Sequence, residues 1–455
     1  MTHGAEFIQS KYPVIDVDNV VIREEEFGGI IFDSRTPRCE YYLTNRYTLK
    51  ILKKIDGTTS LEDIKREFGY NAIKIIDYLA KNNMLFFQTE DLWKGNPVKT
   101  LNENNTSCLQ SPFLITINPS IRCEMNCNFC YVTPSMKNAC KELSIEQYKF
   151  FINEMVDCGV CLLDIFGGEP FLYPQIYELL RYVSTKPLNV VISTNGLAFE
   201  YDKLSGLEKF FGNKITFNIS LHSGEEKNHD QMVGYKGAFN VIINKIKTLV
   251  EHKVRFNVSA VVTKENLKNI ESLLVCLKKL NHNSINFLFY HEMKQKSCQQ
   301  DFSLSVWDFY NFKKNITHLN KYKYGGYFKF SFEYPFFWVY EHSRKPEDNF
   351  ALKYYSGCLL NTKLDVLTDG SIVPCIHLIP YVDKLGNIKR DSIKQIWLSP
   401  KLNKFRKRVA FEIKKCNNCE YQSLCKNQCL AYVLSHNGDF FDRDPRCNKG
   451  DSECI

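Results

Sequence analysis

Apolar residues follow two different spacings along this chain, and the change between them outlines its elements. Between residues 113 and 293, short runs rich in valine, isoleucine and phenylalanine alternate with longer segments whose apolar residues recur every three or four positions. The first pattern is typical of buried strands and the second of amphipathic helices, most clearly from Ala238 to His252. Alternating strands and helices predict an α/β fold with a parallel sheet and crossover helices.

The elements predicted for this region make six strand–helix units. The predicted strands are Leu114–Asn118, Leu162–Phe166, Asn189–Ser193, Ile215–Ser220, Arg255–Val262 and Ile285–Tyr290. The predicted helices are Ser144–Cys158, Gln175–Thr185, Asp202–Phe211, Ala238–His252 and Leu267–Asn281. In barrels of this kind the chemistry lies at the carboxyl ends of the strands.

Residues 1–95 carry a smaller and separate pattern, in which strands precede helices. The predicted strands are Val14–Glu24, Gly28–Phe32 and Glu40–Leu43, and the predicted helices are Tyr47–Ile55, Ser60–Phe68 and Asn71–Asn82. The apolar run Met84–Phe87 closes this module as a last strand. Residues 96–112 are polar and rich in asparagine, which predicts a linker.

Length and composition bound the class of protein. A chain of 455 residues usually needs more than one hydrophobic core, so we expect two or three domains. A content of 44% hydrophobic and 24% charged residues is ordinary for a soluble protein. We see neither an apolar run of membrane-spanning length nor a secretory signal. A net charge of +8 permits an acidic partner without implying nucleic acid.

Eighteen cysteines in a chain without a visible export signal favour metal binding over disulfides. Cys123, Cys127 and Cys130 form a C-x3-C-x2-C run soon after the first predicted barrel strand. Three thiolates so close in sequence can ligate one face of an iron–sulfur cube and leave one iron free for a small molecule. Zinc is the alternative, although it normally takes four ligands in paired spacings.

This cysteine run, with Phe129 before its last cysteine and with Gly167, Gly168, Glu169 and Pro170 after the second strand, resembles the radical S-adenosylmethionine (SAM) superfamily. The resemblance implies a partial (β/α)6 barrel of the TIM type and a 4Fe-4S cluster on the three cysteines. It also implies reductive cleavage of SAM to a 5′-deoxyadenosyl radical. The glycine turn is implied to hold the amino group of SAM, with Glu169 as an anionic acceptor.

Four further positions are implied by the resemblance to contact SAM. Ser193 and Asn195 end the third strand, Ser220 ends the fourth, and Val262 ends the fifth. The family uses such positions for the ribose, the methionine carboxylate and, on the fifth strand, the adenine. Each residue is explained equally well as an ordinary polar strand end or core residue.

The sequence departs from the family at one position. Where related enzymes commonly carry an arginine that pairs with the SAM carboxylate, this chain has Val233. Lys236 and Arg255 are the candidates to replace that arginine, and neither is favoured by the sequence.

A second group of cysteines lies in residues 358–455, after a bridging region, residues 294–357, that assigns no chemistry. The group resembles the SPASM extension of peptide-modifying radical SAM enzymes, which carries two auxiliary iron–sulfur clusters, taken here as 4Fe-4S. The resemblance implies that one cluster is held by Cys358, Cys375 and Cys429, and the other by Cys416, Cys419, Cys425 and Cys447. Cys454 is a candidate fourth ligand of the first cluster. A zinc ribbon on the same thiolates is the alternative.

The N-terminal module is winged-helix-like, and its three strands and three helices resemble the leader-peptide recognition element of peptide maturases. In that family a leader peptide adds a strand to the edge of the module's sheet. A DNA-binding winged helix is the alternative. Its third helix would offer Lys74 and Lys81 but no arginine for reading bases.

These resemblances together predict a cytoplasmic radical SAM oxidoreductase that binds a leader and installs a thioether, from cysteine sulfur to carbon, in a ribosomally made precursor peptide. The alternatives are a carbon–carbon or ether cross-link, a sulfatase-maturing enzyme and, more remotely, an iron–sulfur transcription regulator. The expected partners are the precursor peptide and an electron donor such as flavodoxin or ferredoxin. No catalytic side chain is assigned, because radical chemistry of this kind needs no general base.

Overall fold

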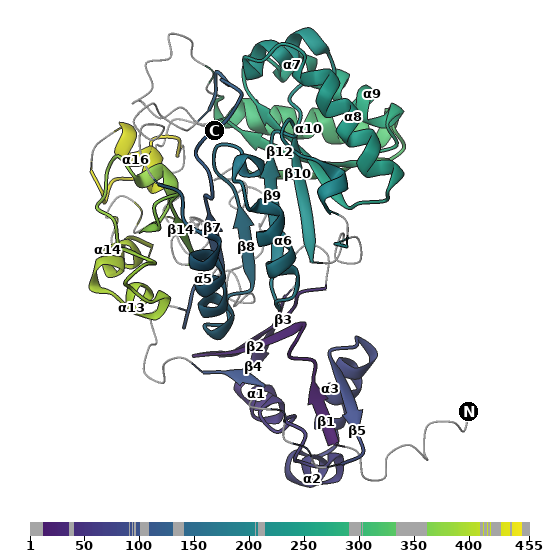
Figure 1. Cartoon of the computed structure of the whole chain (residues 1–455), viewed down its shortest axis with the longest axis vertical. Helices are drawn as coiled ribbons and strands as arrows, with labels where there is room; N and C mark the ends of the chain where they lie inside the picture. Colours follow the sequence, from purple (N-terminus) through teal and green to yellow (C-terminus); the bar gives the residue numbers. More distant parts are fainter. Residues whose placement is uncertain are drawn as a thin grey trace.

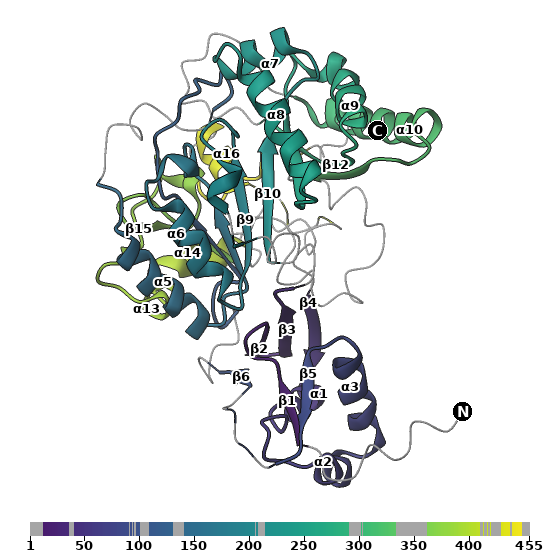
Figure 2. The same cartoon turned by 45° about the vertical axis from the view of Figure 1, so that its right-hand side comes forward.

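The computed structural model describes residues 12–35, 41–90, 92, 94, 97–100, 109–130, 141–204, 206–207, 214–290, 302, 304–333, 362–409, 413, 416, 419, 429–436 and 439–447. A small N-terminal module lies at one end of a larger body, which is built on a single long sheet (Figure 1). Figure 2 shows the same two parts from another side.

The strands of the large sheet are β7 (Leu114–Ile117), β8 (Leu162–Ile165), β9 (Asn189–Thr194), β10 (Ile215–Ser220), β11 (Phe256–Val262), β12 (Ser284–Phe289), β13 (Lys329–Glu333), β14 (Lys363–Val366), β15 (Ser371–Val373) and β16 (Gly386–Asn387). Their order is β13-β12-β11-β10-β9-β8-β7-β14-β15-β16. Neighbours from β13 to β14 pair in parallel, and the last two pairs are antiparallel.

Helices connect the parallel strands, as right-handed crossovers of an α/β fold require. They are α5 (Ile145–Asp157), α6 (Ile176–Ser184), α7 (Glu226–Val233), α8 (Ala238–Glu251), α9 (Ile270–Lys279) and α10 (Val306–Lys323). Each described crossover helix from α5 to α9 buries an apolar stripe, such as Ile242, Ile246 and Leu249 of α8. The predicted α/β fold with a partial parallel barrel is confirmed.

The structure differs from the predicted elements in two places in the barrel. The helix predicted at Asp202–Phe211 begins as a short 3-10 turn, Tyr201–Leu204, and most of its remainder lies outside the described residues. The helix α7 was not predicted, because its sequence is polar up to Met232 and Val233. The sheet also continues through β13 and β14, past the boundaries at residues 293 and 358 that the sequence suggests.

The N-terminal module contains two small sheets and three helices. Its elements are β1 (Tyr12–Ile15), β2 (Val20–Glu25), β3 (Gly28–Asp33), β4 (Tyr41–Asn45), α1 (Arg46–Leu52), α2 (Leu61–Phe68), α3 (Tyr70–Lys81), β5 (Leu85–Gln88) and β6 (Val98–Lys99). The single strand predicted at Val14–Glu24 is wrong. A turn closed by Asn19 N–H donating to the Asp16 carbonyl (3.0 Å) separates β1 from β2.

Strands β2 and β3 join the module to the barrel by their two faces. Val20, Ile22 and Ile31 pack into the module's own core, whereas Ile30 and Phe32 pack into the core of the barrel. Because successive strand residues point to opposite faces, a strand segment buried on both sides carries consecutive apolar residues, here Val20–Ile22 and Ile30–Phe32.

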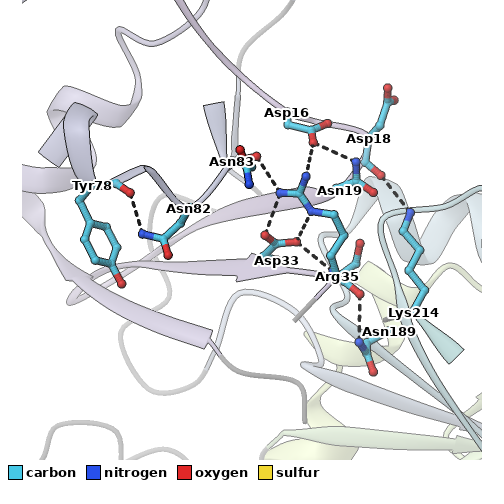
Figure 3. A network of polar contacts seen from close by, with 11 residues as sticks. Asp16, Asp18, Asn19, Asp33, Arg35, Tyr78, Asn82, Asn83, Asn189 and Lys214 are labelled. Carbon is cyan, nitrogen blue, oxygen red and sulfur yellow. Dashed lines mark hydrogen bonds and ion pairs between the residues drawn. The ribbon is translucent and has the colours of Figure 1, made fainter. Parts of the chain in front are cut away.

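Polar contacts hold the module against the amino ends of the barrel strands (Figure 3). Asn189, the first residue of β9, donates from Nδ2 to the Ser34 carbonyl (3.1 Å), and Lys214 Nζ donates to the Asp18 carbonyl (3.4 Å). The Arg35 guanidinium bridges the carboxylates of Asp33 and Asp16 (2.8 and 3.0 Å). The module is therefore docked on the barrel through both apolar and polar contacts.

The C-terminal part attaches to the other edge of the sheet. The strands β14 and β15 lead into the helices α13 (Ile393–Trp397), α14 (Pro400–Val409) and α16 (Leu430–His436). Trp397 is fully buried, and its Nε1–H donates to the Leu109 carbonyl (2.6 Å) just before β7. Among the described residues, no helix has the length and apolar character that crossing a membrane requires.

Candidate active site at the carboxyl ends of the parallel strands

The glycine turn after β8 supports the cysteine loop by backbone contact. Gly168 N–H donates to the Ser120 carbonyl (2.9 Å), and Glu169 N–H donates to the Arg122 carbonyl (2.7 Å). A Cβ atom on Gly168 would lie much closer to the Arg122 carbonyl oxygen than van der Waals contact allows, and one on Gly167 (φ +146°) would lie 2.5 Å from the Ser120 oxygen. Glycines are therefore required where the two loops touch.

The end of α7 supports the cysteine loop from a second direction. Asn126 N–H donates to the Val233 carbonyl (3.0 Å), and Asn128 N–H donates to the Met232 carbonyl (3.1 Å). A Cβ atom on Gly234 would lie 2.7 Å from the Asn126 oxygen. Neither α7 nor this contact was predicted from the sequence. Gly234, which follows the apolar pair Met232 and Val233, is the signal that could have indicated a helix end.

The three cysteines of the loop line one cavity of about 1430 Å³, together with Phe129, Gly167 and Gly168. Cys123, Cys127 and Cys130 are each half-buried. Asn195 Nδ2–H donates to Cys123 Sγ (3.5 Å), and burial raises the pKa of that thiol. Among the described residues, no three His, Cys, Asp or Glu side chains lie close enough to hold a single metal ion. Three thiols of one loop facing a common space fit an iron–sulfur cluster, whose usual ligands are thiolates.

Glu169 is not among the described residues that line the cavity, and its role as an anionic acceptor for SAM stays a prediction. Its carboxylate is fully buried and accepts hydrogen bonds from Thr194 Oγ1–H (2.7 Å), Asn195 N–H (2.7 Å) and Phe171 N–H (3.0 Å). Burial raises its pKa to about 7, and the three hydrogen bonds act against that rise. Glu169 thus ties the glycine turn to the end of β9. Pro170 is buried and begins the 3-10 turn η1 (Pro170–Leu172).

The other predicted SAM contacts divide into lining and buried residues. Ser193, Asn195 and Ser220 all line the cavity. Val262 does not: it is fully buried, and its neighbour Val261 lines the cavity instead. Successive residues of a strand point to opposite faces of a sheet, so only one of these two valines can face the cavity.

The two candidates for the missing arginine differ in their relation to the cavity, because Arg255 lines it and Lys236 does not. Arg255 precedes β11, about 20 Å along that strand from Val261 at 3.3 Å per residue. Lys236 is exposed, in the turn between α7 and α8. The side chain of Val233 is fully buried. This distance places Arg255 far from the cysteine end of the cavity.

His222, which follows β10, supplies a fixed hydrogen-bond donor to this end of the cavity. Its Nδ1 accepts from Val261 N–H (3.1 Å), so the neutral ring carries its proton on Nε2. Burial lowers the pKa of His222 well below its usual value, and His229 lowers it further. The ring lines the cavity with its centroid 4.8 Å from that of Phe129. His222 therefore stays neutral and keeps one tautomer.

The C-terminal cysteines divide between two places. Cys375 precedes the 3-10 turn Ile376–Leu378, and Cys429 precedes α16 and lines the main cavity. Burial raises the pKa of Cys416, and the nearby Cys447 and Cys419 raise it further. Cys358 and Cys425 lie outside the described residues, as does Cys454. Cys416 thus lies near Cys447 and Cys419, and the assignment of the cysteines to two auxiliary clusters stays a prediction.

An open parallel barrel with a three-cysteine loop against a glycine turn is the architecture of a radical SAM enzyme. Residues 117–277 match the model of the Radical SAM superfamily, and residues 358–420 match that of the SPASM iron-sulfur cluster-binding domain. The chain thus contains a Radical SAM domain and a SPASM domain, and the cofactors that these domains bind are SAM and 4Fe-4S clusters, auxiliary clusters included.

The chain is similar over its whole length to AlbA, the antilisterial bacteriocin subtilosin biosynthesis protein of Bacillus subtilis strain 168, with 25% identity over 98% of each chain. An AdoMet-dependent heme synthase of Methanosarcina barkeri is 26% identical over 74% of this chain and 96% of its own. Among solved structures, Streptococcus suis SuiB bound to precursor peptide SuiA covers 96% of this chain and 100% of that chain, with 20% identity and a TM-score of 0.76.

A buried histidine of the same cavity gives a prediction on pH. His282 stacks on Phe256 (centroids 4.0 Å apart), and burial lowers its pKa to about 4. The unfolded chain, with a pKa of about 6.5, binds this proton first as the pH falls, so folding stability is lost between about pH 6.5 and about pH 4. From about pH 7 to about pH 5 the loss is about 2 kcal/mol.

Replacing His282 with glutamine should remove this loss, measured as the difference in free energy of urea unfolding between the two pH values. His318→Gln, at an exposed position on α10, is the matched control and should keep the full dependence. An equal pH dependence in wild type and His282→Gln would contradict the assignment.

Proposed function

We propose that this enzyme matures a ribosomally made precursor peptide by joining a cysteine sulfur to a carbon atom in a thioether. The observation that carries the proposal is that one cavity connects the three-cysteine loop with Cys429 of the C-terminal domain. A peptide in that cavity would lie between two sets of cluster ligands. Similarity to AlbA spans 98% of this chain, against 74% for the heme synthase, which supports a peptide over a porphyrin substrate.

The residues of the cysteine end would hold and orient the cofactors. Cys123, Cys127 and Cys130 would ligate the cluster, which with SAM supplies a 5′-deoxyadenosyl radical that takes a hydrogen atom from the peptide. The glycine turn and α7 fix the loop, and Asn195 donates to Cys123. His222 would donate a hydrogen bond from Nε2–H to a ligand beside Phe129. The surrounding side chains would limit the access of water to the radical.

Closing a thioether removes two hydrogens from the peptide, so the balance requires an electron acceptor. The carbon loses a hydrogen atom to the radical, and the thiol loses a proton while one electron leaves as the bond forms. Cys375 and Cys429 would hold the auxiliary cluster that takes this electron or binds the sulfur. A one-electron donor such as flavodoxin or ferredoxin would supply the electron that SAM cleavage needs. The enzyme and this donor would both lie in the cytoplasm.

The N-terminal module would bind the leader of that peptide. A groove of about 260 Å³ lies between β3, β4 and α3, lined by Ile31, Tyr42, Thr44, Thr48, Lys74, Ile75, Tyr78 and Leu79. Among the described strands, β4 is at the edge of its sheet and has one side open to a further strand. Tyr78 is 49% exposed, and its ring contacts that of Tyr42.

Tyr78→Ala should weaken leader binding about tenfold, because aromatic anchors dominate such interfaces. Tyr70, on the same helix but outside the groove and 66% exposed, provides the matched control Tyr70→Ala. Fluorescence anisotropy of a labelled leader peptide would measure both. Equal binding by the two variants would contradict a leader site in this groove.

Mass spectrometry of the precursor encoded beside the gene tests the bond. After coexpression, a thioether leaves the modified cysteine resistant to both reduction and alkylation, and Cys→Ser in the peptide abolishes the product. A cross-link that forms equally in the peptide lacking cysteine would contradict the thioether and favour a carbon–carbon or ether bond.

A further inference from the structure

The cavity extends well beyond the cysteine end of the barrel. Its lining includes Val261 at the carboxyl end of β11 and Arg255 before the first residue of the same strand. At about 3.3 Å per residue these positions lie about 20 Å apart. Its volume of about 1430 Å³ also exceeds the roughly 300–1,000 Å³ of an ordinary small-molecule site. The half of the cavity nearer Arg255, called the lower half below, is therefore space that a SAM molecule bound beside the cysteines does not fill.

The far end of the cavity lies beside the N-terminal module. Asn189, Arg255, Ser284 and Lys329 line it, and each is at or next to the first residue of its strand. Asn189 is also the residue that donates to the Ser34 carbonyl of the module (Figure 3). A chain leaving the module thus meets this end of the cavity first.

A row of polar side chains crosses the wall of the lower half. Ser284 Oγ–H donates to Asn257 Oδ1 (2.6 Å), and Asn257 Nδ2–H donates to Asn218 Oδ1 (3.0 Å), which makes a ladder across β12, β11 and β10. The amide NH2 of Asn218 has no further partner among the described residues. Barrel interiors are ordinarily filled by bulky branched side chains. Amides and hydroxyls facing a cavity suit a ligand that is itself rich in amides, such as an extended peptide backbone.

Two basic side chains line the far end of the cavity. Arg255 and Lys329 both line it, whereas Asp164 is the sole carboxylate among the described residues that line the whole cavity. Lys329 is exposed and Arg255 is half-buried, so both can meet a chain arriving from solvent. Two cations at an entrance attract a carboxylate more strongly than they attract a neutral segment.

We propose that the lower half of the cavity is a second peptide subsite, which takes an extended, acidic stretch of the substrate through the Arg255–Lys329 end. This inference rests on the proposed function and adds to it the path of the substrate. The acidic stretch pairs with Arg255 and Lys329, the backbone lies along the Asn218–Asn257–Ser284 ladder, and the residues to be joined reach the cysteine end.

The test compares Lys329→Glu and Arg255→Glu with Lys247→Glu, an exposed position of α8 that carries the same change of charge away from the cavity. Asn257→Leu removes the ladder without changing charge. Two readouts are needed: formation of 5′-deoxyadenosine without peptide, and KM for the precursor encoded beside the gene. A precursor with its acidic residues changed to amides completes the comparison.

We expect each charge reversal to raise KM for the acidic precursor about tenfold, the worth of one hydrogen bond to a charged group. Asn257→Leu should raise KM as well, and peptide-free SAM cleavage should stay unchanged in all variants. The amide form should bind wild type about tenfold less tightly than the acidic form, with no such difference in Lys329→Glu.

Unchanged KM values in both charge reversals would overturn the inference. So would a parallel fall in peptide-free SAM cleavage, because the far end would then serve the cofactor. Failure of the proposed function gives a different result: the wild-type enzyme cleaves SAM but modifies no peptide, and the subsite falls with it.

Discussion

Cys127→Ala is expected to reduce 5′-deoxyadenosine formation to the level of a protein-free control. Cys127 is the middle cysteine of the three-cysteine loop and lines the cavity with Cys123 and Cys130. A cluster that keeps only two protein thiolates is not held as a cube with a single open iron. Anaerobic reconstitution followed by chromatographic measurement of 5′-deoxyadenosine gives the activity, and iron analysis gives the cluster content.

Cys276→Ala is the matched control, because Cys276 is half-buried on α9 and outside the cavity's lining. It should retain wild-type activity and iron. Because the C-terminal cysteines are intact in both variants, iron should fall only by the share of one cluster in Cys127→Ala. SAM cleavage by Cys127→Ala above the level of the protein-free control would show that the three-cysteine loop is not required for this reaction.

Gly168→Ala should have the second-largest effect, because its methyl group would meet the carbonyl oxygens of Ile121 and Arg122. The cysteine loop and the glycine turn would have to separate, at the expense of the hydrogen bonds from Gly168 and Glu169 to that loop. Overpacking of this kind costs about 1–3 kcal/mol, and here the displaced atoms also position the ligands. We expect loss of most SAM cleavage and a lower melting temperature.

Gly326→Ala separates this clash from the ordinary cost of replacing a glycine. Gly326 has φ +75°, and a Cβ atom there would have no other atom within 4 Å. Its substitution should therefore lower the free energy of unfolding by about 1 kcal/mol and leave activity unchanged. The melting temperature and the rate of 5′-deoxyadenosine formation should be measured for both variants. Gly168→Ala with wild-type activity would show that the two loops need not touch.

The sequence allowed the barrel and the cysteine loop to be predicted because both depend on local patterns. Alternating strands and amphipathic helices specify a parallel sheet, and the forty-residue interval between Cys127 and the glycine turn corresponds to one crossover helix, α5. Helix α7 lacks such a pattern, since most of its residues are polar. Its role in supporting the loop at Asn126 arises only from tertiary contact.

Side-chain direction was the part that sequence could not supply. Glu169 is polar and adjacent to two glycines of the site, yet it points into the protein and binds Thr194. Val261 and Val262 are chemically identical neighbours, and only the register of β11 decides which one faces the cavity. The position of Arg255 at the far end, in contrast, follows from the predicted strand Arg255–Val262, which begins at this residue.

The most direct test of a SAM-cleaving peptide maturase is a coupled assay. The reconstituted enzyme is incubated anaerobically with SAM, a reductant and the precursor, and 5′-deoxyadenosine and peptide mass are followed together. One 5′-deoxyadenosine for each peptide that loses the mass of two hydrogens is the predicted result. Release of 5′-deoxyadenosine while the peptide keeps its mass, or no SAM cleavage by an iron-loaded enzyme, would contradict the account.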